Sequence, residues 1–178
     1  MPTTPEDAAA PRRDEVDRII AGWAQARGDL DSSPLAVFSR ISRLARYLEA
    51  ARRDAFTDAG LDGWEFDMLS ALRRSGGDAL SPGALMRETL VTSGTMTTRI
   101  DKLVTRGLIS KNRSPHDGRA VEVRLRSEGV ARVDQAMESL LAAERTLLRP
   151  LTPAGRAGLA DTLRSLLLTF EVDDPLED

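Results

Sequence analysis

The sequence predicts a mainly α-helical fold with a small β-hairpin, arranged as a winged helix-turn-helix joined to a helical dimerisation region. Three observations support this class. Apolar residues recur at three- and four-residue spacing through most of the chain, which is the period of an amphipathic helix. Two runs, 108–111 and 121–125, instead alternate between apolar and polar residues, and a Pro and an Asp-Gly pair separate them as in a hairpin. A short helix, a tight turn and a longer helix precede this hairpin.

The N-terminal part of the chain marks the limits of two helices. A helix is expected from about residue 13 to 27, with Trp23 on its apolar face, and the run 26–32, which contains Gly28 and two aspartates, breaks it. Ser33-Pro34 then supplies an N-cap with proline in the first turn of a long amphipathic helix, which Gly60 ends as a C-cap.

Three shorter helices follow, each with a clear starting signal. Asp62-Gly63-Trp64-Glu65 has the form of a capping box and begins a helix through about Arg74. Ser81-Pro82 begins a short helix, and Thr92 is the expected cap of the longer helix that stops at Gly107. This order, followed by the hairpin, is that of a winged helix-turn-helix.

The chain returns to helix after the hairpin. Ser127 is expected to cap a helix to about Leu148, and Thr152-Pro153 begins a last, leucine-rich helix. The terminal helices carry more apolar surface than the small winged core can cover, so a partner is expected to bury it. The simplest partner is a second copy of the chain. The alternative is that both ends fold back over the monomer.

These signals divide the chain into regions. We expect a disordered N-terminus at 1–12, an added N-terminal helix and linker at 13–32, a dimerisation region formed by 33–60 and 127–172, a winged helix-turn-helix domain at 61–126 and an acidic tail at 173–178.

The composition excludes several classes of protein. The chain has no cysteine and one histidine, His116, so a disulfide framework, a metal site, a catalytic triad and a thiol nucleophile are not expected. No phosphate-cradling glycine loop is recognisable, and we expect neither an enzyme nor a cofactor. The sequence has no membrane-spanning run and no visible signal peptide, which makes the cytoplasm the expected location.

Positive charge is concentrated in one segment. The chain carries a net charge of -3, but from Arg99 to Arg126 there are eight Lys or Arg against three Asp or Glu. Because charges act within about 8 Å at physiological salt, a phosphate backbone would respond to this local excess. The alternative is an ordinary solvated charged face.

Residues 34–170 resemble the MarR family of winged-helix transcriptional regulators, and the motif RIDKLVTRGLISKNRSPHDGRAVEVRL (Arg99 to Leu125) carries the resemblance. The resemblance implies a regulator, here a repressor, that binds a palindromic operator in double-stranded DNA as a homodimer and is released by a small ligand. The sequence departs from the family at Arg126, where threonine is usual. An effector-independent or architectural DNA-binding protein is the alternative function, and a winged-helix protein-interaction module is a further one.

The resemblance also implies which residues contact DNA. Hydroxyls in the first half of the recognition helix can bond phosphates or base edges, Lys102 suits a phosphate, and Arg119 lies where the family's wing arginine enters the minor groove, oriented by Asp117. The full predicted set is Thr92, Ser93, Thr95, Thr97, Thr98, Lys102, Arg113, Asp117 and Arg119. For Arg119, the alternative is a salt bridge within the wing.

The added N-terminal helix is similar to that of the MarR subgroup that includes PecS and urate-responsive repressors. In this subgroup a Trp, an Asp and two Arg line the ligand site; Trp23, Asp67 and Arg99 match the first three, and Lys111 takes the fourth position with Arg113 two residues on. The resemblance implies a small anionic ligand, either urate or a polycarboxylate such as citrate or aconitate. At the fourth position lysine offers a point charge, where arginine offers a planar bidentate fork. The alternatives are that Trp23 anchors the added helix and that Asp67 and Arg99 form a salt bridge.

Overall fold

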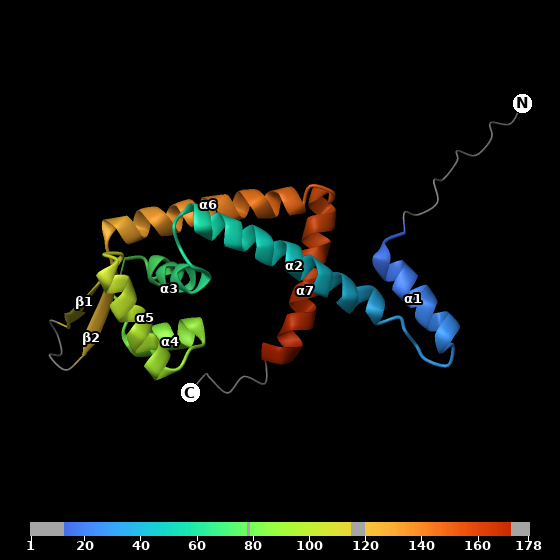
Figure 1. Cartoon of the computed structure of the whole chain (residues 1–178), viewed down its shortest axis with the longest axis horizontal. Helices are drawn as coiled ribbons and strands as arrows, with labels where there is room; N and C mark the ends of the chain where they lie inside the picture. The colour runs from blue at the N-terminus through green and yellow to red at the C-terminus, as the bar shows by residue number, and fades with distance from the viewer. Residues whose placement is uncertain (1–12, 78, 115–119, 172–178) are drawn as a thin grey trace, which may run out of the picture. The chain divides into compact units, whose positions relative to one another are not determined.

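The computed structural model of the chain describes residues 13–77, 79–114 and 120–171 (Figure 1). The expectations for the N-terminus at 1–12 and the acidic tail at 173–178 concern residues outside these ranges. The elements in order are α1 (Glu15–Ala26), α2 (Leu35–Asp58), α3 (Gly63–Arg74), α4 (Pro82–Thr89), α5 (Ser93–Thr105), β1 (Ile109–Arg113), β2 (Val121–Leu125), α6 (Ser127–Leu147) and α7 (Pro153–Glu171). The mainly helical fold with a two-stranded wing is confirmed.

The chain divides within α2 into two compact units, residues 1–50 and 51–178. In the first unit, an acidic capping box begins α1: the Asp14 carboxylate accepts the Asp17 N–H, and the Asp17 carboxylate accepts the Asp14 N–H. Arg40 on α2 donates to both carboxylates at 2.8 to 3.0 Å. Its hydrogen bond to Asp14 lowers the pKa of that carboxyl to about 2. Val16 of α1 is buried.

The second unit contains the main core. Met68, Leu69 and Leu72 of α3 are at most 1% exposed and pack with equally buried residues of α4 and α5. Phe56, near the end of α2, stacks on Phe66 of α3 with ring centroids 4.1 Å apart. These contacts follow from the helical period, which places apolar residues on the inner face of each short helix.

Local chemistry sets most helix limits as expected. The Asp62 N–H donates to the Glu65 carboxylate at 2.9 Å, and the Ser81 hydroxyl accepts the Ala84 N–H at 3.1 Å. Gly60 and Gly107 have φ angles of +66° and +70°, in the left-handed region that favours glycine.

One expected cap is wrong. Ser127 is the first residue of α6, and Arg126 occupies the N-cap position, where its side chain makes no capping hydrogen bond. The departure from the family at Arg126 therefore lies at the cap itself.

The wing is an antiparallel pair in which Ile109 lies opposite Leu125 and Arg113 opposite Val121. Leu80, between α3 and α4, bridges to Val123 through reciprocal backbone hydrogen bonds of 2.9 and 3.1 Å. Val123 and Ile109 are fully buried, so the base of the wing belongs to the core of the second unit.

Apolar side chains are exposed on two of the long helices. On α7, the exposed fractions of Leu159, Leu163, Leu166, Leu167 and Phe170 range from 37% to 75%. On the part of α2 that belongs to the first unit, Phe38, Leu44 and Tyr47 exceed 60%. Among the described residues, none of the helices combines the length and apolarity that crossing a lipid bilayer requires.

Candidate nucleic-acid interface and ligand site

The core holds α5 along one face. Met96, Ile100 and Leu103 are at most 1% exposed, and their spacing places them on a single stripe of the helix. The opposite face is polar. Burial of one stripe thus fixes the helix and leaves its hydroxyl-bearing side in solvent.

The C-terminal end of α5 is held by an ion pair. Arg106, the C-cap of α5, donates to the carboxylate of Glu65 on α3, and also to the Gly60 carbonyl at 2.7 Å. Glu65 is only 2% exposed, whereas the Arg106 side chain is 37% exposed. Sequence reasoning assigned Glu65 a capping role alone. The ion-pair partner of Glu65, Arg106, lies 41 residues later in the chain, so no local sequence pattern indicates this contact.

Six of the residues predicted to contact DNA lie on α5 or at its cap, and all six are exposed: Thr92, Ser93, Thr95, Thr97, Thr98 and Lys102. The Thr97 and Thr98 hydroxyls donate to helix carbonyls four residues back, so their oxygens remain available as acceptors. Arg113 is exposed at the end of β1. Asp117 and Arg119 lie outside the described residues.

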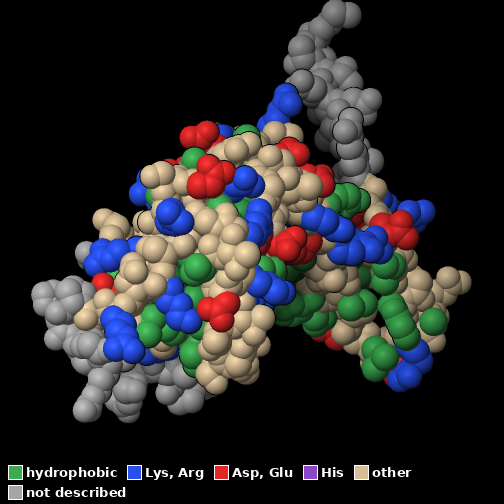
Figure 2. All heavy atoms as spheres, turned by 60° about the vertical axis from the view of Figure 1, so that its left-hand side comes forward, with side chains coloured by type: hydrophobic (Ala, Val, Ile, Leu, Met, Phe, Trp, Pro, Cys, Tyr) green, Lys and Arg blue, Asp and Glu red, His purple; other side chains and the backbone are tan. Residues whose placement is uncertain are grey.

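Several acids near the wing are already neutralised. Asp101 pairs with Lys111 at 3.1 Å, and Glu122 pairs with Arg124 at 3.2 Å and accepts the Ser114 hydroxyl. Figure 2 shows Lys and Arg side chains spread over this side of the molecule with Asp and Glu among them. Among the Lys and Arg of segment 99–126 that the structure describes, all except Arg99 are exposed.

The four predicted ligand residues have separate surroundings. Trp23 lies on α1 in the first unit and is half exposed, while Asp67, Arg99 and Lys111 belong to the second unit. The Asp67 carboxylate lies 3.8 Å from Arg52, and Lys111 bonds Asp101. The Arg99 guanidinium lies 5.3 Å from the centroid of the Trp64 ring, a cation–π contact. The ion pair of Asp67 is thus with Arg52 and not with Arg99.

Asp67 lines a cavity of about 360 Å³ between α2, α3, α4 and α6. Arg52 and Arg74 at its wall pair with two lining acids, Asp67 at 3.8 Å and Glu88 at 3.0 Å. Buried Ser70 provides a hydroxyl, and Met137 and Leu140 provide apolar surface. The volume falls within the roughly 300 to 1,000 Å³ of small-molecule sites. The two guanidinium groups and the two carboxylates at this wall therefore balance in charge.

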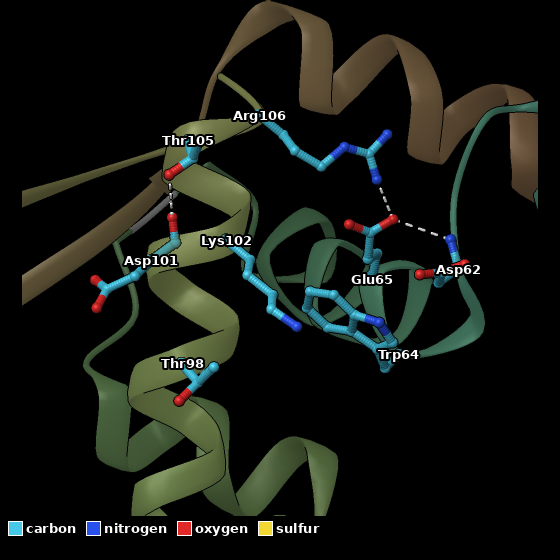
Figure 3. Close-up of a pocket in the computed structure, with 8 residues that line it drawn as sticks. All are labelled: Asp62, Trp64, Glu65, Thr98, Asp101, Lys102, Thr105 and Arg106. Carbon is cyan, nitrogen blue, oxygen red and sulfur yellow. Dashed lines mark hydrogen bonds and ion pairs between the residues drawn. The ribbon is translucent and has the colours of Figure 1, made fainter.

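A second hollow, of about 570 Å³, lies between α3 and the outer side of α5 (Figure 3). It is lined by Asp62, Trp64, Glu65, Thr98, Asp101, Lys102, Thr105 and Arg106. From the sequence, no role is expected for Trp64 beyond its place in the capping box, because a single tryptophan at a helix start belongs to no recognisable motif. Within the described residues, no group of three or more His, Cys, Asp or Glu side chains could hold a metal ion.

Comparisons with known proteins agree with this geometry. Residues 59–120 match the model of the MarR family. The chain is 32% identical to the HTH-type transcriptional regulator PecS of Dickeya dadantii over 139 residues. These matched residues cover 78% of this chain and 84% of PecS. It is 27% identical over 116 residues to the HTH-type transcriptional repressor YetL of Bacillus subtilis, covering 65% of this chain and 70% of YetL.

Solved structures give the same result. Bordetella bronchiseptica BpsR, whose DNA binding is regulated by 6-hydroxynicotinic acid, superposes with a TM-score of 0.59 at 27% identity, covering 73% of this chain and 91% of BpsR. Ligand-free wild-type MarR of E. coli has a TM-score of 0.62 at 22% identity, covering 74% of this chain and 96% of MarR, and so supports the fold. With the match to PecS over most of both proteins, these findings show that the chain belongs to the MarR family of winged helix-turn-helix transcriptional regulators.

Proposed function

We propose that the protein is a repressor that binds a palindromic operator as a homodimer and leaves DNA when a small anion binds. Regulators of the MarR family typically bind DNA as dimers and respond to small molecules. The observation that carries the proposal is α5, with one face locked in the core and the other lined by exposed hydroxyls and Lys102. Such a helix can enter the major groove without rearranging the core.

The exposed apolar faces support the dimer. Leaving several leucines in water is costly, since burying one contributes about 1.5 to 3 kcal/mol. A twofold-symmetric dimer would present two copies of α5 at about 34 Å, one turn of DNA. The operator is therefore expected to be a palindrome.

The ligand set proposed is Trp23, Asp67, Arg99 and Lys111, with Arg113 as the other candidate for the fourth position. The DNA binding of the similar protein BpsR is regulated by 6-hydroxynicotinic acid, which combines a flat ring with a carboxylate. Urate shares the flat ring, and citrate shares the carboxylate. Arg99 belongs to α5 itself, so a ligand that draws Arg99 toward another partner would shift the recognition helix. A ligand that binds the shifted state more tightly must weaken DNA binding.

The test is fluorescence anisotropy with DNA from upstream of the protein's own coding sequence. We expect tight binding that weakens on addition of urate, citrate or 6-hydroxynicotinate, and loss of this response in the Trp23→Ala and Arg99→Ala variants. Arg18→Ala is the control, because Arg18 is an exposed residue on the same helix as Trp23 and pairs only locally with Glu15. Release that persists in both pocket variants would refute the ligand set. Binding that no anion alters would favour an effector-independent DNA-binding protein.

A further inference from the structure

The last carbonyls of α2 are bound by side chains of two other helices. Carbonyls at the C-terminal end of a helix have no partner within it and carry partial negative charge. At residues 58–60, here termed the α2 end, the three carbonyls accept hydrogen bonds from Gln135 and Arg132 of α6 and from Arg106 at the end of α5. All of these residues belong to the second unit. The α2 end is thus joined to both the recognition helix and α6.

The recognition helix contacts the α2 end through Arg106. Its guanidinium donates to the Gly60 carbonyl at 2.7 Å and to the carboxylate of Glu65, which is 2% exposed. Glu65 in turn accepts the Asp62 N–H at 2.9 Å, as Figure 3 shows. Arg106 therefore binds the chain on both sides of the turn from α2 to α3. The end of α5 cannot move away from this turn without breaking charge-assisted hydrogen bonds.

Arg132 of α6 contacts the α2 end from a different helix. Its Nη1 lies 3.4 Å from the carbonyl oxygens of both Ala59 and Gly60. Its Nε donates to the Glu128 carboxylate, one turn earlier in α6, at 2.8 Å, which restricts the orientation of the guanidinium. A Cβ on Gly60 would lie 2.5 Å from this Nη1. The two groups therefore lie too close for a side chain at position 60 while Arg132 keeps this orientation.

The Gly60 carbonyl is an acceptor shared by α5 and α6. In the proposed dimer, α2 and α6 belong to the dimerisation region, whereas α5 enters the major groove. We propose that Arg132 is a positioning residue for operator binding. By bonding the α2 end, it fixes each recognition helix relative to the dimerisation helices and so sets the distance between the two recognition helices. This inference rests on the proposed function, and it assigns Arg132 no contact with DNA.

The test compares a full palindromic operator with a duplex that carries one half-site, by fluorescence anisotropy at fixed salt. Arg132→Ala should raise the Kd for the full operator about tenfold, the scale of one charge-assisted hydrogen bond, and leave the Kd for the half-site within about twofold. A half-site engages one recognition helix and does not report the distance between two. An unchanged Kd for the full operator, or an equal loss on both duplexes, would overturn the inference.

An operator with one base pair inserted between its half-sites gives a second readout. The insertion moves one half-site by about 3.4 Å along the DNA. The wild type should lose more than about tenfold in affinity for this operator. Arg132→Ala should lose less, because its recognition helices are held less firmly at one distance. The same loss in both proteins would count against the positioning role.

Arg145→Ala is the matched control. Arg145 is an exposed arginine of the same helix and makes no hydrogen bond or ion pair through its side chain within the ranges that the structure describes. This variant should leave the Kd for each of the three duplexes nearly unchanged. A loss on the full operator as large as that of Arg132→Ala would mean that removal of positive charge from α6, and not the contact with the α2 end, determines the result.

Two further measurements on Arg132→Ala exclude other causes of weaker binding. The slope of log affinity against log salt should equal that of the wild type, and a slope smaller by about one would identify Arg132 as a phosphate contact and reject the inference. Sedimentation equilibrium should show the oligomeric state of the wild type. A monomeric variant would also reject the inference, because Arg132 would then act on the dimer itself.

Gly60→Ala tests the contact between Arg132 and the α2 end. Alanine at a φ of +66° is strained with or without Arg132, whereas the clash with Nη1 requires Arg132. Gly60→Ala should therefore weaken binding to the full operator more in the wild type than in the Arg132→Ala background. Losses that simply add would contradict the contact.

The wild type separates failure of this inference from failure of the proposed function. If the wild type binds the full operator and the half-site equally well, dimeric binding to a palindrome is wrong, and the positioning role falls with it. If the wild type prefers the full operator and Arg132→Ala keeps the whole of that preference, only the positioning role is rejected.

Discussion

Leu90 adopts a backbone conformation that suits glycine or asparagine better than leucine. It is the C-cap of α4, with φ 52° and ψ 42°, in the turn that leads to the recognition helix. The left-handed region costs a residue with a Cβ about 1 to 2 kcal/mol. Because Leu90 is 79% exposed, burial of its side chain offsets little of this cost. The turn therefore carries local strain.

Replacing Leu90 by asparagine should relieve much of this strain. We expect Leu90→Asn to raise the free energy of unfolding by about 1 kcal/mol, measured by urea denaturation with unchanged slope. Leu90→Ala is the control, because alanine keeps the Cβ and removes the same exposed side chain. Equal effects of the two substitutions would mean that side-chain loss, and not backbone strain, determines the result.

At the scale of elements, the Glu65–Arg106 pair joins α3 to the end of the recognition helix. Arg106→Ala leaves the buried Glu65 carboxylate without its partner and should cost about 3 to 5 kcal/mol of unfolding free energy. Glu65→Gln keeps an acceptor for the Asp62 N–H and leaves a partly exposed arginine, so it should cost about 1 to 2 kcal/mol. Chemical denaturation of the two variants tests whether Arg106→Ala lowers the free energy of unfolding more than Glu65→Gln does.

The matched control is Arg73→Ala. Arg73 makes two hydrogen bonds to the carboxylate of Asp134 and lowers the pKa of that group, but the two side chains are 51% and 43% exposed. Exposed pairs contribute about 0 to 1 kcal/mol. A cost for Arg73→Ala as large as that for Arg106→Ala would contradict the role of burial, as would additive effects in the Glu65→Gln/Arg106→Ala double variant.

Helix limits could be predicted where their causes lie within a few residues. The capping box of α3 and the Ser-Pro start of α4 are local, and both are present in the structure. The start of α6 has a tertiary cause. The Arg126 N–H donates to the Leu108 carbonyl, and a Cβ on Gly129 would lie 2.1 Å from that same oxygen. This close approach to the start of the wing makes the chain turn at Arg126, which a preference for serine at caps does not reveal.

The candidate sites could be predicted only in part, because local sequence patterns do not reveal which side chains meet in the folded protein. The exposed face of α5 follows from helical period, so its outward residues could be identified from sequence. The contacts of Arg99 with Trp64 and of Asp67 with Arg52 join residues that are 15 or more positions apart in the chain, and several partners of suitable charge were available to each. Side-chain packing decides among them.

For the whole molecule, the exposed leucines of α7 should decide the oligomeric state. Leu163 and Leu167 lie four residues apart on one face and are 37% and 57% exposed. Leu163→Glu/Leu167→Glu would put four carboxylates into a symmetric interface, so the dimer should weaken by more than about 100-fold. Sedimentation equilibrium should detect monomers at concentrations where the wild type is dimeric.

A change in the salt dependence of DNA binding should accompany that dissociation. Each protomer contributes its own phosphate contacts, so the slope of log affinity against log salt should fall to about half for the monomer. Thr162→Glu is the control, because Thr162 neighbours Leu163, is exposed, and bonds only the Gly158 carbonyl of its own helix. If the double variant stays dimeric with an unchanged slope, α7 lies outside the interface. The exposed apolar residues of α2, Phe38 and Leu44 among them, then become the surface to test with the same two measurements.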